Sequence, residues 1–477
     1  MKVYPHKTIE AGAVVHTSVI WESRGTSSLF GPRGVSGLVN VEMTPEHVVR
    51  LASAYATTLR KGSAVVTARD SSRAARALKR AVIAALTASA IDVRDLEVAP
   101  MPITRFETGR SDAVGGMVLR TTPGDPQSVD IVFLDADGAD LSPVAQRGLE
   151  RVLSRQEFRR AFPGEIAELT FPSRTVETYT QELLRAVDVS GVEGAGLKVV
   201  LDTSGGAVSL VLPTLLGRLG VEVLTVNNRL SEASTSESVA DRMRDLQRLG
   251  ELVASSRADF GVRFDHVGER LSLLDELGHL VQDDRALLVL LDLVAAERRG
   301  GRIALPVTTT RVAEQVTSFH GTGVLWTSTA PDDLARAARQ PDVVFAGDGL
   351  GGYVLPELSS ALDAVAAFVR LLGLVARTRL TLSQIDARIP HAHVVRRSVL
   401  TPWAVKGAVM RTVVAAAGGL EVDTTDGVRV VEGERRWALV LPDPAEAVTH
   451  VWAEGRDAAE AAALMTTWAE VVQATQS

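Results

Sequence analysis

Cysteine is absent from this sequence and aromatic residues are scarce. Without any cysteine among 477 residues, disulfide bonds, thiolate metal sites and cysteine nucleophiles are excluded. Phenylalanine, tryptophan and tyrosine together make up 4% of the chain, whereas hydrophobic residues make up 46%. We therefore expect cores packed mostly with leucine, valine, isoleucine and alanine.

Long apolar runs and an excess of basic residues are also missing. No stretch of about 18 apolar residues occurs, so we expect no membrane-spanning helix. The formal net charge of −7 argues against nucleic-acid binding, which needs a basic face. Small phosphorylated ligands remain compatible, because local arginine clusters bind them. The N-terminal residues lack the basic-then-apolar order of a signal peptide, and we expect a cytoplasmic protein.

Short strands and helices alternate along most of the chain. Residues 62–67 have the pattern of a strand and residues 72–90 that of a helix, and this order restarts at residues 197–202 and 301–307. Such alternation is typical of mixed or parallel sheets joined by crossover helices. The final part of the chain differs, since two antiparallel strands are expected there before an alanine-rich closing helix.

Chain length and the order of elements predict an α/β protein of several domains. At roughly 150 residues per domain, about three domains are expected, or four small ones. We predict three similar mixed-sheet α/β domains, a small C-terminal α+β domain and a short N-terminal β-helix-like segment. The predicted boundaries are 1–25 for that segment, 26–165, 175–290 and 291–395 for the α/β domains, and 396–477 for the last domain.

The N-terminal segment has a six-residue rhythm. Ile9, Val15 and Ile20 lie close to this period with small residues between them, as in rungs of a left-handed β-helix. Two rungs cannot bury a core alone, since solenoids need about three repeats. The rung interpretation therefore predicts a β-helical partner chain or upstream domain. A plain pair of strands is the alternative.

Five stretches together resemble a known enzyme family. They are residues 30–37 (F-G-P-R-G-V-S-G), 68–70 (A-R-D), 258–265 (A-D-F-G-V-R-F-D), 347–352 (G-D-G-L-G-G) and 401–407 (T-P-W-A-V-K-G). Their order and spacing resemble the α-D-phosphohexomutase family, the phosphomannomutases and phosphoglucomutases, across most of the chain. The chain also resembles the mutase-like C-terminal half of a mannose-1-phosphate guanylyltransferase fusion, in which β-helix rungs precede the mutase-like domains.

The resemblance implies a reaction and four site features. Such a mutase moves a phosphoryl group between the C1 and C6 hydroxyls of a hexose phosphate through a phosphoserine. It needs a phosphorylated hydroxyl, a divalent cation, a sugar-binding loop and a phosphate clamp, because the cation and the clamp offset the charge of the phosphoryl group.

The nucleophile loop of the family, T-A-S-H-N-P, aligns with Arg120-Thr-Thr-Pro-Gly-Asp-Pro126. The serine position falls on Thr122, with Thr121 beside it, so the resemblance implies a phosphothreonine. Pro123 stiffens the backbone and removes a donor N–H. The alternative is a Pro-Gly turn with two ordinary threonines. Arg69 and Asp70 stand where the family keeps its G-R-D and are carried over as catalytic-site residues.

The metal loop of the family, D-x-D-x-D-R, aligns with Asp265-His-Val-Gly-Glu-Arg270. Asp265 and Glu269 keep acid groups, but the middle position is Val267. Mg²⁺ accepts one or two carboxylates with waters and phosphate, so we expect at most a weak Mg²⁺ site. The alternative is a surface turn in which Arg270 contacts one of the acids.

The sugar loop of the family, G-E-x-S-G-H, aligns with residues 347–352. Gly347, Asp348 and Gly351, together with Arg270, are the implied substrate-binding residues. Leu350 stands where the family has serine and cannot hydrogen-bond a hydroxyl. Because polar groups that read hydroxyls carry sugar discrimination, altered hexose binding is expected.

The phosphate clamp of the family, R-P-S-G-T-E-P, is not retained. Its arginine is replaced by Leu441, while Asp443 and Glu446 bring negative charge and Pro444 removes a donor. His450 replaces a further family arginine. Ser36 and Asp332 likewise stand where the family has an active-site arginine and a lysine.

Three hypotheses for function follow. The first is a degenerate mutase that is weakly active or non-catalytic, kept as a regulatory or structural module of nucleotide-sugar (mannose) metabolism. It would sense a hexose phosphate or dock on a mannose-1-phosphate guanylyltransferase. The second is an active phosphomannomutase or phosphoglucomutase that uses a phosphothreonine. The third is binding without turnover of another ligand, with Arg69, Arg120, Arg263 and Arg270 as candidate anion contacts.

Overall fold

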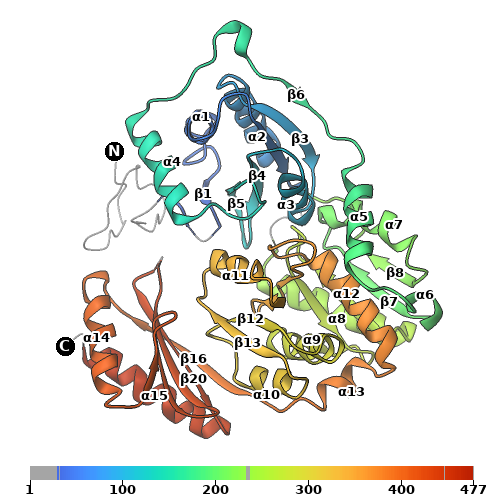
Figure 1. Ribbon diagram of the computed structural model, residues 1–477, viewed down its shortest axis with the longest axis vertical. Coiled ribbons are helices and arrows are strands. Elements are labelled where there is room, and N and C mark those ends of the chain that lie inside the picture. The colour runs from blue at the N-terminus through green and yellow to red at the C-terminus, as the bar shows by residue number, and fades with distance from the viewer. Residues whose placement is uncertain (1–28, 32, 233–236, 445, 476–477) are drawn as a thin grey trace.

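The computed structural model describes residues 29–31, 33–232, 237–444 and 446–475. The predicted N-terminal segment, residues 1–25, lies outside the described residues. The described chain forms four sheets, each built from consecutive elements with its own helices (Figure 1). None of the helices within these ranges is long and apolar enough to cross a bilayer.

The first sheet is mixed and has the strand order β1-β5-β4-β2-β3-β6. Strand β2 pairs in parallel with β3 and β4, and β5 pairs antiparallel with β1 and β4. Its elements are β1 (Val35–Leu38), α1 (Pro45–Thr58), β2 (Ala64–Arg69), α2 (Arg73–Thr87), β3 (Asp92–Val98), α3 (Met101–Arg110), β4 (Gly115–Thr122), β5 (Asp125–Leu134), α4 (Pro143–Arg155) and β6 (Leu169–Thr170).

The second sheet has the order β11-β10-β9-β7-β8, in which β7 pairs in parallel with β8 and β9. Strand β10 pairs antiparallel with β9 and with β11. Its elements are α5 (Thr175–Ala186), α6 (Val192–Ala195), β7 (Lys198–Asp202), α7 (Leu212–Leu216), β8 (Glu222–Val226), α8 (Val239–Ser256), β9 (Phe260–Phe264), β10 (Leu271–Leu274), β11 (Leu280–Val281) and α9 (Asp283–Glu297).

The third sheet has the order β13-β12-β14-β15, with β12 parallel to both β13 and β14. Its elements are β12 (Arg302–Pro306), α10 (Val312–Ser318), β13 (Gly323–Thr327), α11 (Pro331–Ala338), β14 (Val343–Gly347), β15 (Tyr353–Val354), α12 (Ala364–Thr378) and α13 (Leu382–Asp386).

The fourth sheet is antiparallel and has the order β16-β20-β19-β18-β17. Its elements are β16 (His393–Leu400), α14 (Lys406–Ala416), β17 (Glu421–Asp423), β18 (Val428–Gly433), β19 (Arg436–Pro442), β20 (Val448–Gly455) and α15 (Ala458–Ala474). The three mixed-sheet α/β units and the final α+β unit confirm the predicted fold class. Figure 1 shows the fourth unit at the lower left and the first at the top.

The second and third sheets share one hydrophobic core. Helices α9 and α12 supply much of it, and their apolar residues lie between the two sheets. Phe264 of β9 meets Phe368 of α12 edge to face at 5.8 Å. The predicted boundary between residues 290 and 291 falls inside α9, because this helix runs on to Glu297 within the shared core.

Candidate functional site

The loop predicted to carry the nucleophile is a closed β-hairpin turn. Thr122 pairs with Asp125 across a two-residue turn of Pro123 and Gly124, and Gly124 has a φ of +79°. Proline followed by glycine suits such a turn, since proline presets its own φ and glycine tolerates a positive one. The Thr122 side chain is 5% exposed, and its Oγ1 donates to Asp130 Oδ1 at 2.6 Å. The hydroxyl is therefore engaged inside the sheet.

Asp70 braces the same hairpin from the end of β2. One carboxylate oxygen accepts from the Thr121 backbone N–H at 2.6 Å, and the other accepts from the Ser72 N–H at 2.9 Å. The Arg69 guanidinium donates to the Asp70 carbonyl at 2.7 Å. The structure thus brings together the four residues predicted as catalytic, Arg69, Asp70, Thr121 and Thr122, and ties three of them through backbone groups. Their catalytic role stays a prediction.

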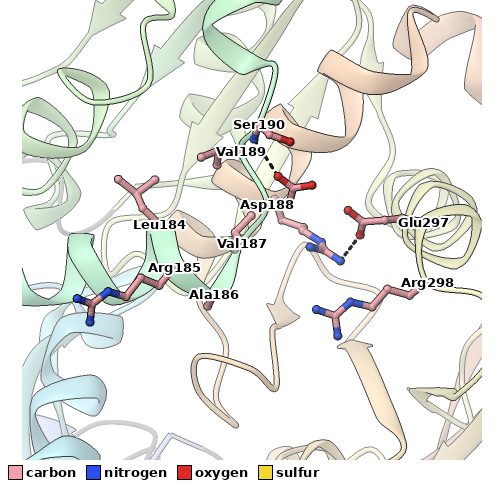
Figure 2. Close-up of a pocket in the computed structure, with 10 residues that line it drawn as sticks. Leu184, Arg185, Ala186, Val187, Asp188, Val189, Ser190, Glu297 and Arg298 are labelled. Carbon is pink, nitrogen blue, oxygen red and sulfur yellow. Dashed lines mark hydrogen bonds and ion pairs between the residues drawn. The ribbon is translucent and has the colours of Figure 1, made fainter.

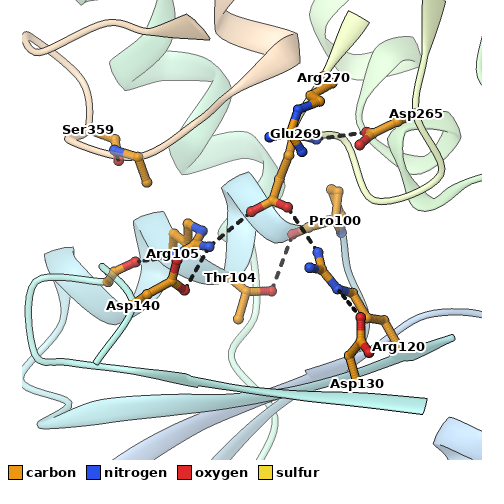
Figure 3. A network of polar contacts seen from close by, with 12 residues as sticks. Pro100, Thr104, Arg105, Arg120, Asp130, Asp140, Asp265, Glu269, Arg270 and Ser359 are labelled. Atoms are coloured by element: carbon orange, nitrogen blue, oxygen red, sulfur yellow. Dashed lines mark hydrogen bonds and ion pairs between the residues drawn. The ribbon is translucent and has the colours of Figure 1, made fainter. Parts of the chain in front are cut away.

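Glu269, at the end of the loop between β9 and β10, lies between two buried arginines (Figure 3). Its Oε1 accepts from Arg105 Nη2 at 2.9 Å and its Oε2 from Arg120 Nη1 at 2.9 Å. Burial acts to raise the pKa of Glu269, but the two arginines outweigh it and lower the pKa to about 2. Burial and the nearby Glu269 raise the pKa of Asp265 to about 6. Asp265 Oδ1 accepts from the Glu269 N–H at 2.8 Å.

These residues do not fit a divalent cation. Mg²⁺ requires free oxygen ligands in a near-octahedral set, whereas both Glu269 oxygens face guanidinium nitrogens. Among the residues that the structure describes, no group of three or more His, Asp or Glu side chains is placed to hold a metal ion. Asp265 and Glu269 therefore lie together as predicted from the sequence, but with an arginine pair where a cation would be held.

The sugar-loop residues are bound by the chain itself. Asp348 Oδ2 accepts from Arg270 Nε at 3.0 Å and Nη2 at 2.7 Å, while Oδ1 accepts from the Leu350 and Gly352 N–H groups. Gly351 has a φ of +83°, and its carbonyl accepts from the Leu271 N–H. Three of the four predicted substrate residues, Arg270, Asp348 and Gly351, are therefore adjacent, and the fourth, Gly347, ends β14 and pairs with Tyr353. The Asp348 carboxylate is held by Arg270 and by backbone N–H groups.

A lysine lies against the loop between β19 and β20. Lys406 Nζ donates to the carbonyls of Asp443 and Glu446, and its side chain is 9% exposed. His450 Nε2 contacts Asp443 Oδ2 at 3.0 Å, and Ser398 Oγ contacts His450 Nδ1 at 2.9 Å. A positive side chain is present at this loop, but it holds the loop's own carbonyls.

Arg263, a predicted anion contact, and the two replaced positions Ser36 and Asp332 also have partners within the chain. Arg263 Nε donates to Asp202 Oδ2 at 3.0 Å within the second unit. Ser36 Oγ donates to Asp130 Oδ1 at 2.6 Å, so it shares this oxygen with Thr122. Asp332 pairs with Arg336 at 3.3 Å on an exposed face of α11.

Two cavities differ in size and place. The smaller one, lined by Asp70, Arg120 and His266 among others, measures about 10 Å³, which is room for roughly one water molecule. A cavity of about 560 Å³ lies instead at the C-terminal ends of α5 and α9 (Figure 2). Its lining includes Glu297 and the buried Arg370, and no predicted site residue.

The sequence did not reveal Arg105, which donates to Glu269, or Asp130, which accepts from Thr122. Arg105 is 6% exposed on α3, whose residues from Met101 to Thr108 are all buried. This burial on all sides is visible only in the structure, because the sequence of α3 contains polar residues throughout. Asp130 is 0% exposed on β5, in a strand that is otherwise apolar towards its end.

The comparisons with known proteins agree with this fold. Two family profiles match, phosphoglucomutase/phosphomannomutase α/β/α domain I over residues 27–160 and domain II over residues 177–278. A phosphoglucomutase/phosphomannomutase of Thermococcus kodakarensis is 28% identical over 433 residues, which cover 90% of this chain and 94% of that protein.

Solved structures are similar across nearly the whole chain. A phosphoglucomutase/phosphomannomutase family protein from Burkholderia thailandensis has a TM-score of 0.82 at 20% identity, covering 94% of this chain and 97% of that chain. An N-acetylphosphoglucosamine mutase of Aspergillus fumigatus in complex with GlcNAc-6P and magnesium has a TM-score of 0.54 at 14% identity, covering 87% and 83%. On these matches and its four-unit fold, the chain belongs to the α-D-phosphohexomutase family.

Proposed function

We propose that this protein is a phosphohexomutase-family member that does not transfer phosphoryl groups by the family's phospho-enzyme route. It serves instead as a regulatory or structural module in hexose-phosphate and nucleotide-sugar metabolism. The single observation that carries this proposal is the state of Thr122. Its hydroxyl donates to the buried carboxylate of Asp130 in a closed hairpin, and Thr122 itself is 5% exposed. A phosphoryl group would have to displace this hydrogen bond before it could bond to that oxygen.

Three further features support the proposal. Both oxygens of Glu269 are held by arginines, Asp348 is held by Arg270, and the carboxylate of Asp443 lies on His450. Phosphoryl transfer depends on positioning and charge stabilisation by groups that are available to the substrate. Here the polar groups that the resemblance assigns to metal, sugar and phosphate are satisfied within the chain.

Turnover provides the test. We expect no conversion of glucose 1-phosphate or mannose 1-phosphate to the 6-phosphate above the buffer rate, with Mg²⁺ and a hexose 1,6-bisphosphate present. The Thermococcus kodakarensis relative serves as the positive control. Conversion by this protein that the Thr122→Val variant abolishes would contradict the proposal.

One observation favours the second candidate, an active mutase with a phosphothreonine. Asp130 Oδ1 accepts from Thr122 Oγ1 at 2.6 Å, a distance at which a carboxylate acts as general base for a hydroxyl. This role requires the hairpin to open, because Asp130 is 0% exposed. The same assay separates the candidates, since only the second predicts turnover that the Asp130→Asn variant also removes.

The module function predicts a partner. The rung pattern of residues 1–25 fits docking on the β-helix of a mannose-1-phosphate guanylyltransferase. Co-purification of the full chain with that enzyme tests the idea. A chain lacking residues 1–25 is the control and should no longer be retained. Equal retention of both chains would contradict docking through this segment.

A further inference from the structure

A three-residue ion cluster joins the first unit to the second. Arg105 comes from α3, Arg120 from β4 and Glu269 from the loop between β9 and β10. Their side chains are 7%, 9% and 8% exposed, so the charges are removed from water. Figure 3 shows both guanidinium groups pointing at the Glu269 carboxylate from the side of the first unit.

The surplus positive charge of this cluster is balanced inside the first unit. Arg105 also contacts Asp140 at 3.1 Å and donates to the Gly138 carbonyl. Arg120 faces Asp130 at 3.8 Å. Each arginine thus lies between a carboxylate of its own unit and Glu269 of the next, in the position of a cation that bridges two acidic groups.

The middle position of the loop between β9 and β10 is the apolar residue Val267. Val267 packs against the apolar cluster that contains Met101 and Val118. Its backbone carbonyl accepts from the Met101 N–H at 2.9 Å, at the start of α3. A carboxylate at this position would provide a third oxygen ligand, whereas valine contributes packing between the two units.

We propose that the Arg105–Glu269–Arg120 cluster takes the place of a divalent cation and joins the first two units without any metal ion. Two guanidinium groups supply the positive charge that the loop carboxylate needs, through charge-assisted hydrogen bonds. A divalent cation is kept out because it would have to displace a buried arginine from each Glu269 oxygen that it used.

The neighbouring residue extends the junction to the third unit. Arg270 places two guanidinium nitrogens on Asp348, in the turn after β14. The consecutive pair Glu269–Arg270 therefore binds the first unit with one side chain and the third with the other. The loop between β9 and β10, which the resemblance assigns to a metal ion, therefore connects the first, second and third units.

Direct metal binding is the first test, and it does not depend on whether the protein turns over substrate. Mn²⁺ is the probe, and electron paramagnetic resonance counts the free ion in the presence of the full chain. We expect no bound Mn²⁺ at submillimolar concentration. One bound Mn²⁺ per chain that the Glu269→Gln variant loses would overturn the inference.

Thermal unfolding is the second test. MgCl₂ and EDTA should leave the apparent melting temperature of the wild-type chain unchanged at matched ionic strength. Glu269→Gln should lower it by roughly 5 °C or more, because two buried guanidinium groups lose their shared partner. The matched control is Glu182→Gln, which removes an exposed partner of Arg185 and should shift the temperature little.

A designed double variant tests whether a metal site can be restored at this position. Arg120→Ser with Val267→Asp removes one guanidinium and adds the missing acid beside Asp265 and Glu269. We expect this double variant to bind Mn²⁺ where the wild-type chain does not. A double variant that remains folded by circular dichroism and still binds no Mn²⁺ would contradict the claim that the cluster fills a cation's place.

Discussion

Two of the joints between units differ in how much buried charge they contain. The second and third units meet through a continuous apolar core with α9, α12 and the Phe264–Phe368 contact. The first and second units meet through buried charges centred on Glu269, beside apolar contacts of Val267, Ile103 and Phe106. The apolar joint derives its stability from area removed from water. The polar joint is specific but sensitive, since a buried charge that loses its partner costs several kcal/mol.

This difference affects how each joint tolerates substitution. An apolar joint needs only the right volume, so it persists through many substitutions. A joint made from buried charges persists only if each charge keeps a partner. In this chain Arg105, Arg120, Arg270 and the two carboxylates that they hold, Glu269 and Asp348, satisfy that condition without a ligand.

Truncation of the apolar joint should have the largest effect. Phe368→Ala removes a fully buried ring from α12, and we expect a loss of about 4 kcal/mol in the free energy of unfolding. Urea denaturation followed by circular dichroism measures it. The control is Phe319→Ala, whose ring is 86% exposed, and a similar loss for both would contradict the assignment of the core.

A buried carboxylate at the apolar joint, Asp363, should make stability depend on pH. Asp363 caps α12 and accepts from Tyr179, and burial raises its pKa to about 6. A raised pKa favours the protonated form, so this contribution is present at low pH and is lost as pH rises through about 6. Two pKa units correspond to about 3 kcal/mol.

Melting curves of the wild-type chain and the Asp363→Asn variant between about pH 4 and pH 7 check this dependence. Asparagine cannot ionise, so the variant should gain on the wild type as pH rises. A constant difference between the two chains across this range would contradict the pKa of Asp363.

Removal of one arginine should weaken the polar joint by less. Arg120→Met keeps the length of the side chain but deletes the guanidinium, and we expect a loss of about 2 kcal/mol because Arg105 still holds Glu269. Chemical denaturation gives the value. Arg185→Met, at an exposed pair, should cost less than about 0.5 kcal/mol. Equal effects would show that the joint is not desolvated.

The smallest effect is expected at the hairpin. Thr122→Val deletes the donor to Asp130 without changing shape, at a cost of about 1 kcal/mol, since Ser36 still donates to the same oxygen. Thr122→Ser keeps the hydroxyl and should be close to the wild type. A loss as large for serine as for valine would mean that the methyl group, not the hydrogen bond, is what matters.

The sequence predicted the fold class, because alternating patterns at β2, β7 and β12 are local signals. It also placed Thr122, Glu269 and Asp348 in loops or turns that the structure brings to the same region. The Pro123-Gly124 turn was one of the two alternatives drawn from the sequence, and the structure shows that geometry.

Partners across units could not be predicted in this way. Arg105 and Glu269 are 164 residues apart, and Arg270 and Asp348 are 78 apart, so no local pattern connects them. The same limit affected the boundary at residues 290 and 291. Helix α9 is apolar almost all round because it packs between two sheets, and only the three-dimensional core reveals this.

Peptide mapping for phosphate after incubation with a hexose 1,6-bisphosphate tests the central claim most directly. The Thr122 hydroxyl donates to Asp130 in a closed hairpin. We therefore expect unmodified peptides containing Thr121 and Thr122, with the mass of the chain unchanged. One phosphoryl group per chain on either threonine would contradict it.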